Sequence, residues 1–295
     1  MVLLGPNRYG KAEVRVVRVA RGAAPDGGDL IRDWNVSTSL SGDLAAASLR
    51  GDNSHVLPTD SQKNKVYALA RDMGPVEPET FGLSLAAFFV SSQEPITRAR
   101  IEVEEYGWSP IGATGYSFAR SGDLVRTTVV TVDAALGASV VSGIRDLVVL
   151  NTTASEFWGY PRDAYTTLPE TRDRMLATAV NAQWRYRPDV AAGPDAGWGV
   201  AFASAKAALV AAFTGTYSSS LQQTLYAMGS AVLADVPSAC EVRLELPNKH
   251  HYLVDLAPFG LVNDREVYNA GDRPYGLIEG HVLADDAPDA GLAWT

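Results

Sequence analysis

The sequence predicts an α+β fold in which helices cover one face of an antiparallel sheet. Two observations predict it. Segments that alternate apolar and polar residues, as half-buried strands do, occur in pairs, and two segments with apolar residues at helical spacing separate one pair from the next. This order of two strands, two helices and two strands occurs twice in the 295 residues. Strands and helices grouped in this way favour an antiparallel sheet with its helices on one side.

The first predicted unit covers residues 1–137. Alternating patterns predict its four strands, at 13–21, 29–40, 98–106 and 125–132. Apolar residues at helical spacing predict helices at 60–73 and 78–91, which Gly74 and Pro75 separate. We expect Asp60 to cap the first of these helices, because a carboxylate accepts hydrogen bonds from the free amides at a helix start.

The second predicted unit covers residues 138–295. Its pattern predicts strands at 138–150, 174–187, 240–247 and 250–257, with helices at 198–213 and 219–235. A short additional strand is expected at 275–283. A sheet covered on one side leaves a face and two edges bare. We therefore expect a homo-oligomer in which partner subunits close the sheet into a barrel.

Composition excludes several classes of function. The chain carries 25 basic and 34 acidic residues, a formal charge of -9, and no basic run, so we expect no binding to nucleic acid or to membranes. Cys240 is the single cysteine, which excludes an intrachain disulfide and most cysteine metal sites. The most apolar segment, 199–213, contains Lys206 and falls short of a bilayer span. With no signal peptide and no peroxisomal tripeptide, we expect a cytoplasmic protein.

Two of the four histidines, His250 and His251, stand in a polar run behind Pro247, between two strand patterns. Adjacent strand residues point to opposite faces, so this pair cannot hold one metal ion, and we expect no metal site. Asn248 and His250 would share a face and could bind one ligand together. Composition alone favours a plainer interpretation, a solvated turn or bulge after Pro247.

Two further segments carry residue types that suggest a ligand. Thr59 stands just before the first predicted helix with no evident structural role. The irregular segment 156–174 ends in Arg174 and contains three other candidates, Phe157, Trp158 and Arg162. Such aromatics are usually core and such arginines usually solvated. An irregular connection with both types nevertheless suits a planar anion, which needs a stacking face and a bidentate clamp.

Five segments, in this order along the chain, resemble the signature segments of the urate oxidase (uricase) family: RYGK (8–11), TDSQKN (59–64), EFWGYPRDAYTTLPETRDR (156–174), LQQTLYAMG (221–229) and LPNKHHYLVDL (246–256). The resemblance implies the tunnelling fold, with two tandem ββααββ units per chain and antiparallel sheets that close into a barrel in a dimer. Two barrels would stack into a homotetramer with a central tunnel. Active sites would lie at the subunit interfaces.

The activity that this resemblance implies is oxidation of urate by O2 and water to 5-hydroxyisourate and hydrogen peroxide. It implies no cofactor and no metal, because the deprotonated substrate itself is the reductant for oxygen.

The same resemblance implies roles for nine residues. Lys11, Thr59 and His250 would be catalytic, with the first two supplied by the neighbouring subunit. The substrate-binding residues would be Thr59, Asp60, Phe157, Arg174, Leu221, Gln222 and Asn248. Leu221 and Asp60 would bind through their main chains, whereas Phe157 would stack on the purine and Arg174 with Gln222 would hold its oxygens and nitrogens.

The sequence departs from the family at Thr114 and Tyr116, where many members have an H-x-H pair. This leaves open any property of assembly, tunnel or pH dependence that such histidines support. Two other interpretations also remain: a tunnelling-fold enzyme acting on a pteridine or GTP, and a non-catalytic purine-binding homologue. Arg174 with Gln222 argues against the first, since those relatives commonly anchor the ring with a glutamate. The presence of Lys11 and Thr59 argues against the second.

Overall fold

A single eight-stranded antiparallel sheet organises the protein. The computed structural model describes residues 2–191, 196–271 and 273–295. The strands lie side by side in the order β1-β2-β3-β4-β5-β6-β7-β10, and every neighbouring pair is antiparallel. Within the described residues the sheet stays open, with β1 and β10 as its edges. The predicted α+β class is confirmed.

The elements of the first half follow the predicted order. They are β1 (Val14–Ala20), β2 (Leu30–Gly42), the short α1 (Ala45–Arg50), α2 (Thr59–Met73), α3 (Pro78–Ser92), β3 (Ile96–Pro110) and β4 (Phe118–Asp133). One prediction here was wrong. The residue before α2 is Pro58, and Asp60 instead lies in the first turn, where Lys63 pairs with it and Asn64 Nδ2 donates to it at 3.1 Å.

The second half repeats that order with one change at its end. Its elements are β5 (Gly137–Asn151), β6 (Leu176–Tyr186), α4 (Pro188–Ala191), α5 (Trp198–Gly215), α6 (Leu221–Asp235), β7 (Ala239–Asn248), β8 (His251–Leu253), the 3-10 turn η1 (Ala257–Phe259), β9 (Tyr268–Ala270) and β10 (Gly276–Leu283). The division of the chain at 137/138 falls after the first residue of β5, just past the turn that joins β4 to β5, and it stays a prediction.

The strand predicted at 250–257 was wrong in its length and in its place. The chain leaves the sheet after Asn248, and β8 pairs only with β9 in a separate ribbon. The position beside β7 belongs to β10, the segment expected only as a short addition. Tyr252 and Leu253 are about half exposed, whereas Val282 of β10 is buried against α6. Burial of an apolar side chain therefore selects β10 as the last strand of the sheet.

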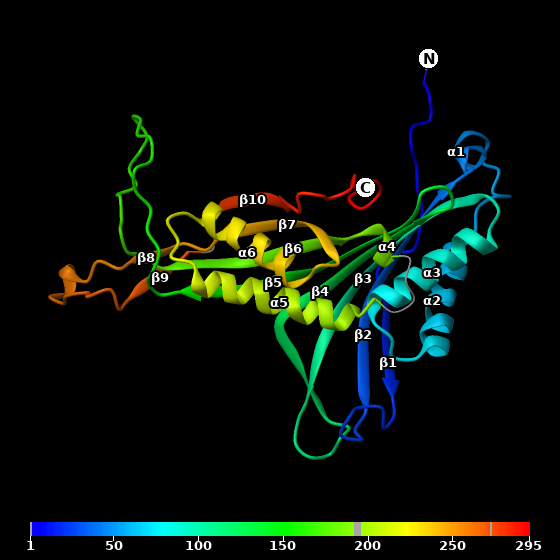
Figure 1. Cartoon of the computed structure of the whole chain (residues 1–295), viewed down its shortest axis with the longest axis horizontal. Coiled ribbons are helices and arrows are strands. Elements are labelled where there is room, and N and C mark those ends of the chain that lie inside the picture. Colours follow the sequence, from blue (N-terminus) through cyan, green and yellow to red (C-terminus); the bar gives the residue numbers. More distant parts are fainter. Residues whose placement is uncertain (1, 192–195, 272) are drawn as a thin grey trace.

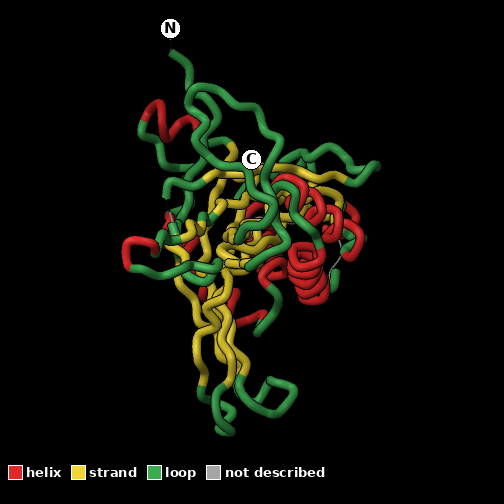
Figure 2. The backbone as a smooth tube through the Cα atoms, turned by 90° about the vertical axis from the view of Figure 1, so that its left-hand side faces the viewer, coloured by secondary structure: helices red, strands yellow, loops and turns green. Residues whose placement is uncertain are grey.

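The helices α2, α3, α5 and α6 pack on one face of the sheet, and the core lies between these two layers (Figures 1 and 2). Trp34 of β2 and Phe81 of α3 are fully buried with ring centroids 4.8 Å apart. In the second half, the Trp198 ring of α5 packs edge-on against the Tyr186 ring of β6, with ring centroids 4.8 Å apart.

The α5 helix has 18 residues and by length and composition alone is long and apolar enough to cross a membrane, so the prediction that this apolar segment is too short was wrong. Here Leu209 and Phe213 pack that helix into the core.

A buried ionic cluster joins α3 to the sheet. The Glu79 carboxylate is fully buried, and it accepts hydrogen bonds from Arg126 Nη2 at 2.8 Å, Thr128 Oγ1 at 3.1 Å and Ser142 Oγ at 2.5 Å. Burial alone would lower the pKa of Arg126, but three surrounding carboxylates outweigh it and raise that pKa. The α3 helix is therefore anchored to β4 and β5 through charge as well as apolar contact.

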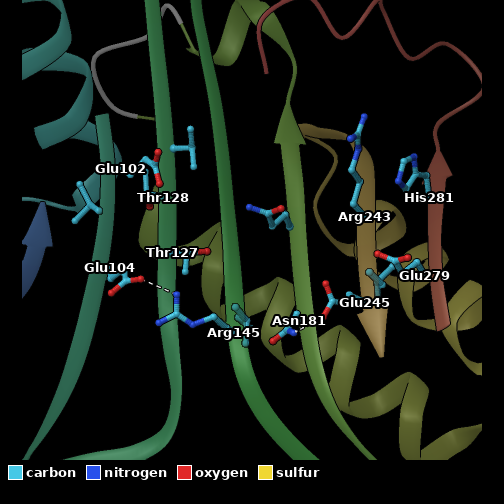
Figure 3. A pocket seen from close by; sticks show the side chains of 15 residues that line it. Glu102, Glu104, Thr127, Thr128, Arg145, Asn181, Arg243, Glu245, Glu279 and His281 are labelled. Carbon is cyan, nitrogen blue, oxygen red and sulfur yellow. Dashed lines mark hydrogen bonds and ion pairs between the residues drawn. The ribbon is translucent and has the colours of Figure 1, made fainter. Parts of the chain in front are cut away.

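The opposite face of the sheet is polar. Figure 3 shows a pocket of about 470 Å³ there, lined by Glu102, Glu104, Arg145, Arg243 and His281 among others. Arg145 Nη1 donates to Glu104 at 2.6 Å across this face. A sheet with one apolar and one polar face is suited to a barrel whose polar face lines a water-filled interior.

Two turns project together from the body of the molecule, the β1–β2 turn and the β3–β4 turn (Figures 1 and 2). The Asp29 amide donates to the Gly115 carbonyl at 2.7 Å and links them. Thr114 and Tyr116 lie in the second turn, where Thr114 Oγ1 accepts the Ser117 amide at 3.1 Å and the Tyr116 ring is 69% exposed.

Far from these turns, Cys240 is fully buried in β7, and its thiol donates to the Arg185 carbonyl at 3.5 Å.

Candidate active site

The nine residues predicted to form a site fall into two groups. The structure places one group near the start of β6 and the end of β7. We call it the arginine half-site; its members are Phe157, Arg174, Leu221, Gln222, Asn248 and His250. The other group lies beside β2 at the start of α2. We call it the lysine half-site; its members are Lys11, Thr59 and Asp60.

A network of backbone hydrogen bonds holds the loop that carries Phe157 and Arg174. Phe157 and Thr171 exchange backbone hydrogen bonds at 2.8 and 3.0 Å, and the Arg174 amide donates to the Ser155 carbonyl at 2.9 Å. Ser155 is fully buried and bridges to Ser218, two residues before the cap of α6. The long irregular segment is thereby tied to the start of α6, which brings Phe157 and Arg174 toward Leu221 and Gln222.

The Arg174 guanidinium is held over the Phe157 ring. The guanidinium carbon lies 5.2 Å from the Phe157 ring centroid, and Nε of Arg174 donates to Ser155 Oγ at 3.3 Å. Burial lowers the pKa of Arg174. Within the described residues its two Nη atoms make no hydrogen bond. This fixed cation therefore has its bidentate edge free for a ligand anion.

Tyr160 covers one face of Phe157. The two rings are stacked with centroids 4.8 Å apart and planes 18° apart, and the Tyr160 hydroxyl donates to the Leu168 carbonyl at 2.6 Å. Stacking fixes the plane of the Phe157 ring.

The start of α6 contributes further donors. Ser220 caps the helix by accepting the Gln223 amide at 3.1 Å, and Gln223 Oε1 in turn accepts the Ser219 amide at 3.0 Å. The amides of Leu221 and Gln222 have no partner among the described residues, as is usual in the first turn of a helix. The Leu221 side chain is buried, whereas that of Gln222 is exposed and equally without a partner there. Both residues can donate to an anion.

Asn248 and His250 complete this half-site from the end of β7. Asn248 pairs with Thr178 of β6 and Gly276 of β10, and the His250 carbonyl accepts the Gly271 amide at 2.8 Å. Since the strand ends at Asn248, the prediction that these two side chains share the face of one strand was wrong. Burial, and then the positive charge of Arg174, lower the pKa of His250. The imidazole beside Arg174 is thus kept neutral and able to accept a proton.

In the lysine half-site, Thr38 of β2 fixes the main chain of Lys11. The Lys11 amide donates to Thr38 Oγ1 at 3.0 Å, and the Thr38 amide donates to the Lys11 carbonyl at 2.9 Å. Thr38 Oγ1 also donates to Oε1 of the buried Gln62 at 2.6 Å. Because Gln62 lies in the first turn of α2, this chain of bonds sets Lys11 relative to Thr59 at the start of that helix.

Asp60 carries the negative charge of the lysine half-site. A hydrogen bond from Lys63 lowers the pKa of this carboxylate most, and the positive charge of Lys11 adds to the effect. The Thr59 hydroxyl makes no hydrogen bond within the part of the chain that the structure describes, so it is available to a ligand.

The two half-sites cannot meet within one chain. Four strand spacings of about 4.8 Å each separate β2 from β6, roughly 19 Å along the sheet. Figure 1 accordingly shows α2 and α6 toward opposite ends of the molecule. Proton transfer needs groups within about 3 Å of one another. A ligand in contact with both half-sites would therefore need two copies of the chain.

The structure also separates residues that the sequence suggested together. Trp158 is 46% exposed and lies under the Arg172 guanidinium at 3.9 Å, and Arg162 is exposed, so neither belongs to the arginine half-site. Sequence reasoning missed Tyr160, Thr38 and Gln62, whose roles appear only through contacts. No cluster of three or more potential metal ligands occurs among residues 2–191, 196–271 and 273–295.

The chain is similar to known proteins over most of its length. A sequence profile of the uricase family matches residues 7–131 and 140–279. A uricase of Arthrobacter globiformis is 47% identical over 278 residues, 94% of this chain and 89% of that protein. A uricase of Dictyostelium discoideum is 35% identical over 288 residues, 96% of this chain and 98% of that protein. The crystal structure of the Arthrobacter globiformis uricase superposes with a TM-score of 0.91 at 45% identity, covering 98% of this chain and 97% of that one. The chain belongs to the uricase family.

Proposed function

We propose that this protein is a urate oxidase, an oxidoreductase of the EC 1.7.3.3 type that uses O2 as acceptor and needs no cofactor. The observation that carries the proposal is the arginine half-site. A guanidinium whose two Nη atoms have no partner within the described residues lies over an aromatic ring whose plane is fixed by stacking. Urate is planar, electron-rich and anionic, and it matches both surfaces at once.

Binding uses the arginine half-site. Urate stacks on Phe157, and Arg174 with the Gln222 amide holds its oxygens and ring nitrogens. The Leu221 main-chain amide adds a donor from the start of α6. The Asp60 main chain adds another from a second subunit, because the two half-sites lie too far apart within one chain.

The reaction balances without an added reductant. Lys11 removes a proton from bound urate, and Thr59 and His250 pass it onward. The electron-rich dianion transfers two electrons to O2, which takes up two protons and leaves as hydrogen peroxide. Water adds to the dehydrourate that remains and gives 5-hydroxyisourate. Asn248 holds the position over the ring that water and O2 occupy in turn.

Assembly completes each site. Pairs of chains close the open sheet into a barrel, with edges β1 and β10 at the joints, and two barrels form a homotetramer. Each site then takes its arginine half-site from one chain and its lysine half-site from the partner.

The direct test combines two readouts on protein dialysed against a chelator. Loss of urate absorbance and uptake of O2 should proceed at equal rates, with one hydrogen peroxide formed per urate consumed. Addition of transition metals should not raise the rate. Urate binding with no oxygen uptake at any pH near neutrality would favour a purine-binding homologue and overturn the proposal.

A further inference from the structure

A second pocket lies on the polar face of the sheet, apart from both half-sites. It has a volume of about 270 Å³. Its lining includes three arginines and three hydroxyl residues: Arg8, Arg98, Arg100, Ser39, Ser41 and Thr131. Thr295 borders it as well. A liquid-water molecule takes up about 30 Å³, so a small ion fits there together with several waters.

Strand register builds this pocket. Ser39 of β2 is directly opposite Arg100 of β3, and Arg100 is directly opposite Thr131 of β4. In the next row, Ser41 is opposite Arg98. Side chains in one such row lie about 5 Å apart on the same face. Hydroxyl groups thus flank the two guanidinium groups.

The chain segment before β1 adds a third guanidinium. Tyr9 pairs with Leu40 at the edge of β2, and its hydroxyl donates to the Leu57 carbonyl at 3.1 Å on the helix side. Arg8, the preceding residue, lines the pocket on the other face. Alternation along the paired segment thereby aims Arg8 at the row of Ser39 and Arg100.

Positive charge exceeds negative charge at this position. Arg98 Nε donates to Asp133 at 2.8 Å, and Arg100 pairs with Glu102. Arg8 forms no ion pair or hydrogen bond within the described residues. Burial, and then the neighbouring positive charge of Arg8, lower the pKa of Arg100. One guanidinium charge is therefore uncompensated, in a chain whose formal charge is -9.

Two buried polar atoms of the pocket are also without partners. Thr131 is 1% exposed and its Oγ1 makes no hydrogen bond within the described residues. The Nε atom of the partly buried Arg100 is itself buried and likewise has no partner there. Buried polar groups in folded proteins are nearly always hydrogen-bonded, so these two atoms are available to a bound polar group. Here both belong to one row of side chains.

We propose that this pocket binds a tetrahedral oxyanion of the phosphate or sulfate class. Guanidinium groups and hydroxyls are the side chains that such an anion prefers, and the four anion oxygens can accept from Arg8, Arg100 and Thr131 together. None of these residues belongs to either half-site. The site would fasten the segment before β1 to the sheet three residues from Lys11.

Isothermal titration calorimetry with inorganic phosphate, sulfate and chloride at matched ionic strength tests the proposal. We expect saturable binding of phosphate, sulfate or both, and none of chloride. Arg8→Gln, at an exposed position that folding tolerates, and the isosteric Thr131→Val should each weaken binding, by about tenfold for the charged residue. Thr127→Val and Arg145→Gln are matched controls, since both residues line the pocket of Figure 3 on the same face.

The titration separates the two oxyanions and the competing explanations. Phosphate changes from a monoanion to a dianion near neutral pH, whereas sulfate stays a dianion, so the ratio of phosphate affinity to sulfate affinity at a pH where both are dianions shows which ion is preferred. Absence of saturable heat overturns the proposal. So does equal loss of binding in Arg145→Gln and Arg8→Gln, which would indicate general attraction to the polar face. The readout is ion binding, so the result is independent of urate oxidation.

Discussion

The Lys11 amine extends from a main chain that is hydrogen-bonded to Thr38 through both the amide and the carbonyl of Lys11. Substitution of this side chain thus removes a functional group without loosening the segment. We predict that Lys11→Met slows turnover by about 100-fold or more, the usual contribution of a positioned acid or base. Affinity for an unreactive purine analogue should change little, because the amine is assigned a role in proton removal.

Steady-state kinetics paired with analogue titration measures this difference. Lys206→Met is the matched control, since Lys206 pairs with Asp123 on the helix side of the molecule. Equal losses of turnover and affinity in Lys11→Met would reassign Lys11 to substrate binding.

A second prediction at this scale concerns the imidazole of His250. Its pKa lies below the ordinary value of about 6.5 because of burial and of Arg174. In Arg174→Gln the positive charge is gone while the burial remains, so the pKa should rise part of the way back. Protonation of the depressed histidine favours the unfolded chain. The contribution of His250 to stability is therefore present above about pH 6.5 and is lost as the pH falls through the lowered pKa.

An NMR titration of the imidazole protons, assigned with His250→Asn, measures that midpoint in the two proteins. Arg172→Gln is the matched control, because Arg172 lies in the same loop but stacks on Trp158. An unchanged midpoint in Arg174→Gln would show that the charge of Arg174 does not contribute to the lowered pKa of His250.

The sequence singles out the residues of the candidate site, but it does not show the contacts that hold them in place. Phe157 and Arg174 attract attention as an aromatic and a cation in an irregular loop, and the structure holds them 5.2 Å apart. Tyr160 looks like any loop aromatic until its stacking on Phe157 is seen. Thr38 and Gln62 lie 24 positions apart and meet only because α2 packs beside β2. Contacts between distant segments leave no local pattern.

Among the elements, α3 depends on Glu79 at its first turn. This carboxylate accepts three side-chain hydrogen bonds and is fully buried. We predict that Glu79→Ala lowers the free energy of unfolding by about 3 kcal/mol, because it leaves Arg126 buried with one of its carboxylates gone. Removal of the exposed Asp123–Lys206 pair by Lys206→Ala should cost less than about 1 kcal/mol.

Urea unfolding followed by tryptophan fluorescence compares the two variants at one fixed subunit concentration, because assembly adds to the stability of each chain. If Glu79→Ala and Lys206→Ala lowered the free energy of unfolding by similar amounts, the buried cluster would be no more stabilising than a surface ion pair.

Most elements were predictable because their apolar periodicity repeats over several turns or residues. The α2 and α3 helices show it, and so do the paired strands. The exchange of β8 for β10 was not predictable in this way. Both segments alternate apolar and polar residues, and only the packing of Val282 against Gly229 of α6 decides which one joins the sheet. Pairing with β7 is a property of the assembled layers and not of the strand.

At the scale of the whole molecule, the distance between the half-sites predicts complementation between inactive chains. Lys11→Met and Arg174→Gln chains should each be nearly inactive alone. When they are co-expressed with different tags, a mixed dimer pairs the two intact half-sites in one of its two sites. With random pairing about one quarter of all sites are then complete.

Recovered activity in the doubly tagged fraction measures the effect. Lys11→Met chains carrying both tags are the control, because none of their sites is complete. If both half-sites served one ligand within a single chain, no combination of the two variants could restore turnover.

The buried thiol of β7 has a practical consequence. Burial raises the pKa of Cys240, and the side chain is fully covered, so reagents that need a thiolate will not reach it in the folded protein. A cysteine introduced at Tyr116, at the tip of the projecting turns, would be the one reactive thiol per chain. Spin labels or fluorophores could be attached there without removing the natural cysteine. The spectroscopic distances between them would map how the subunits are arranged in solution.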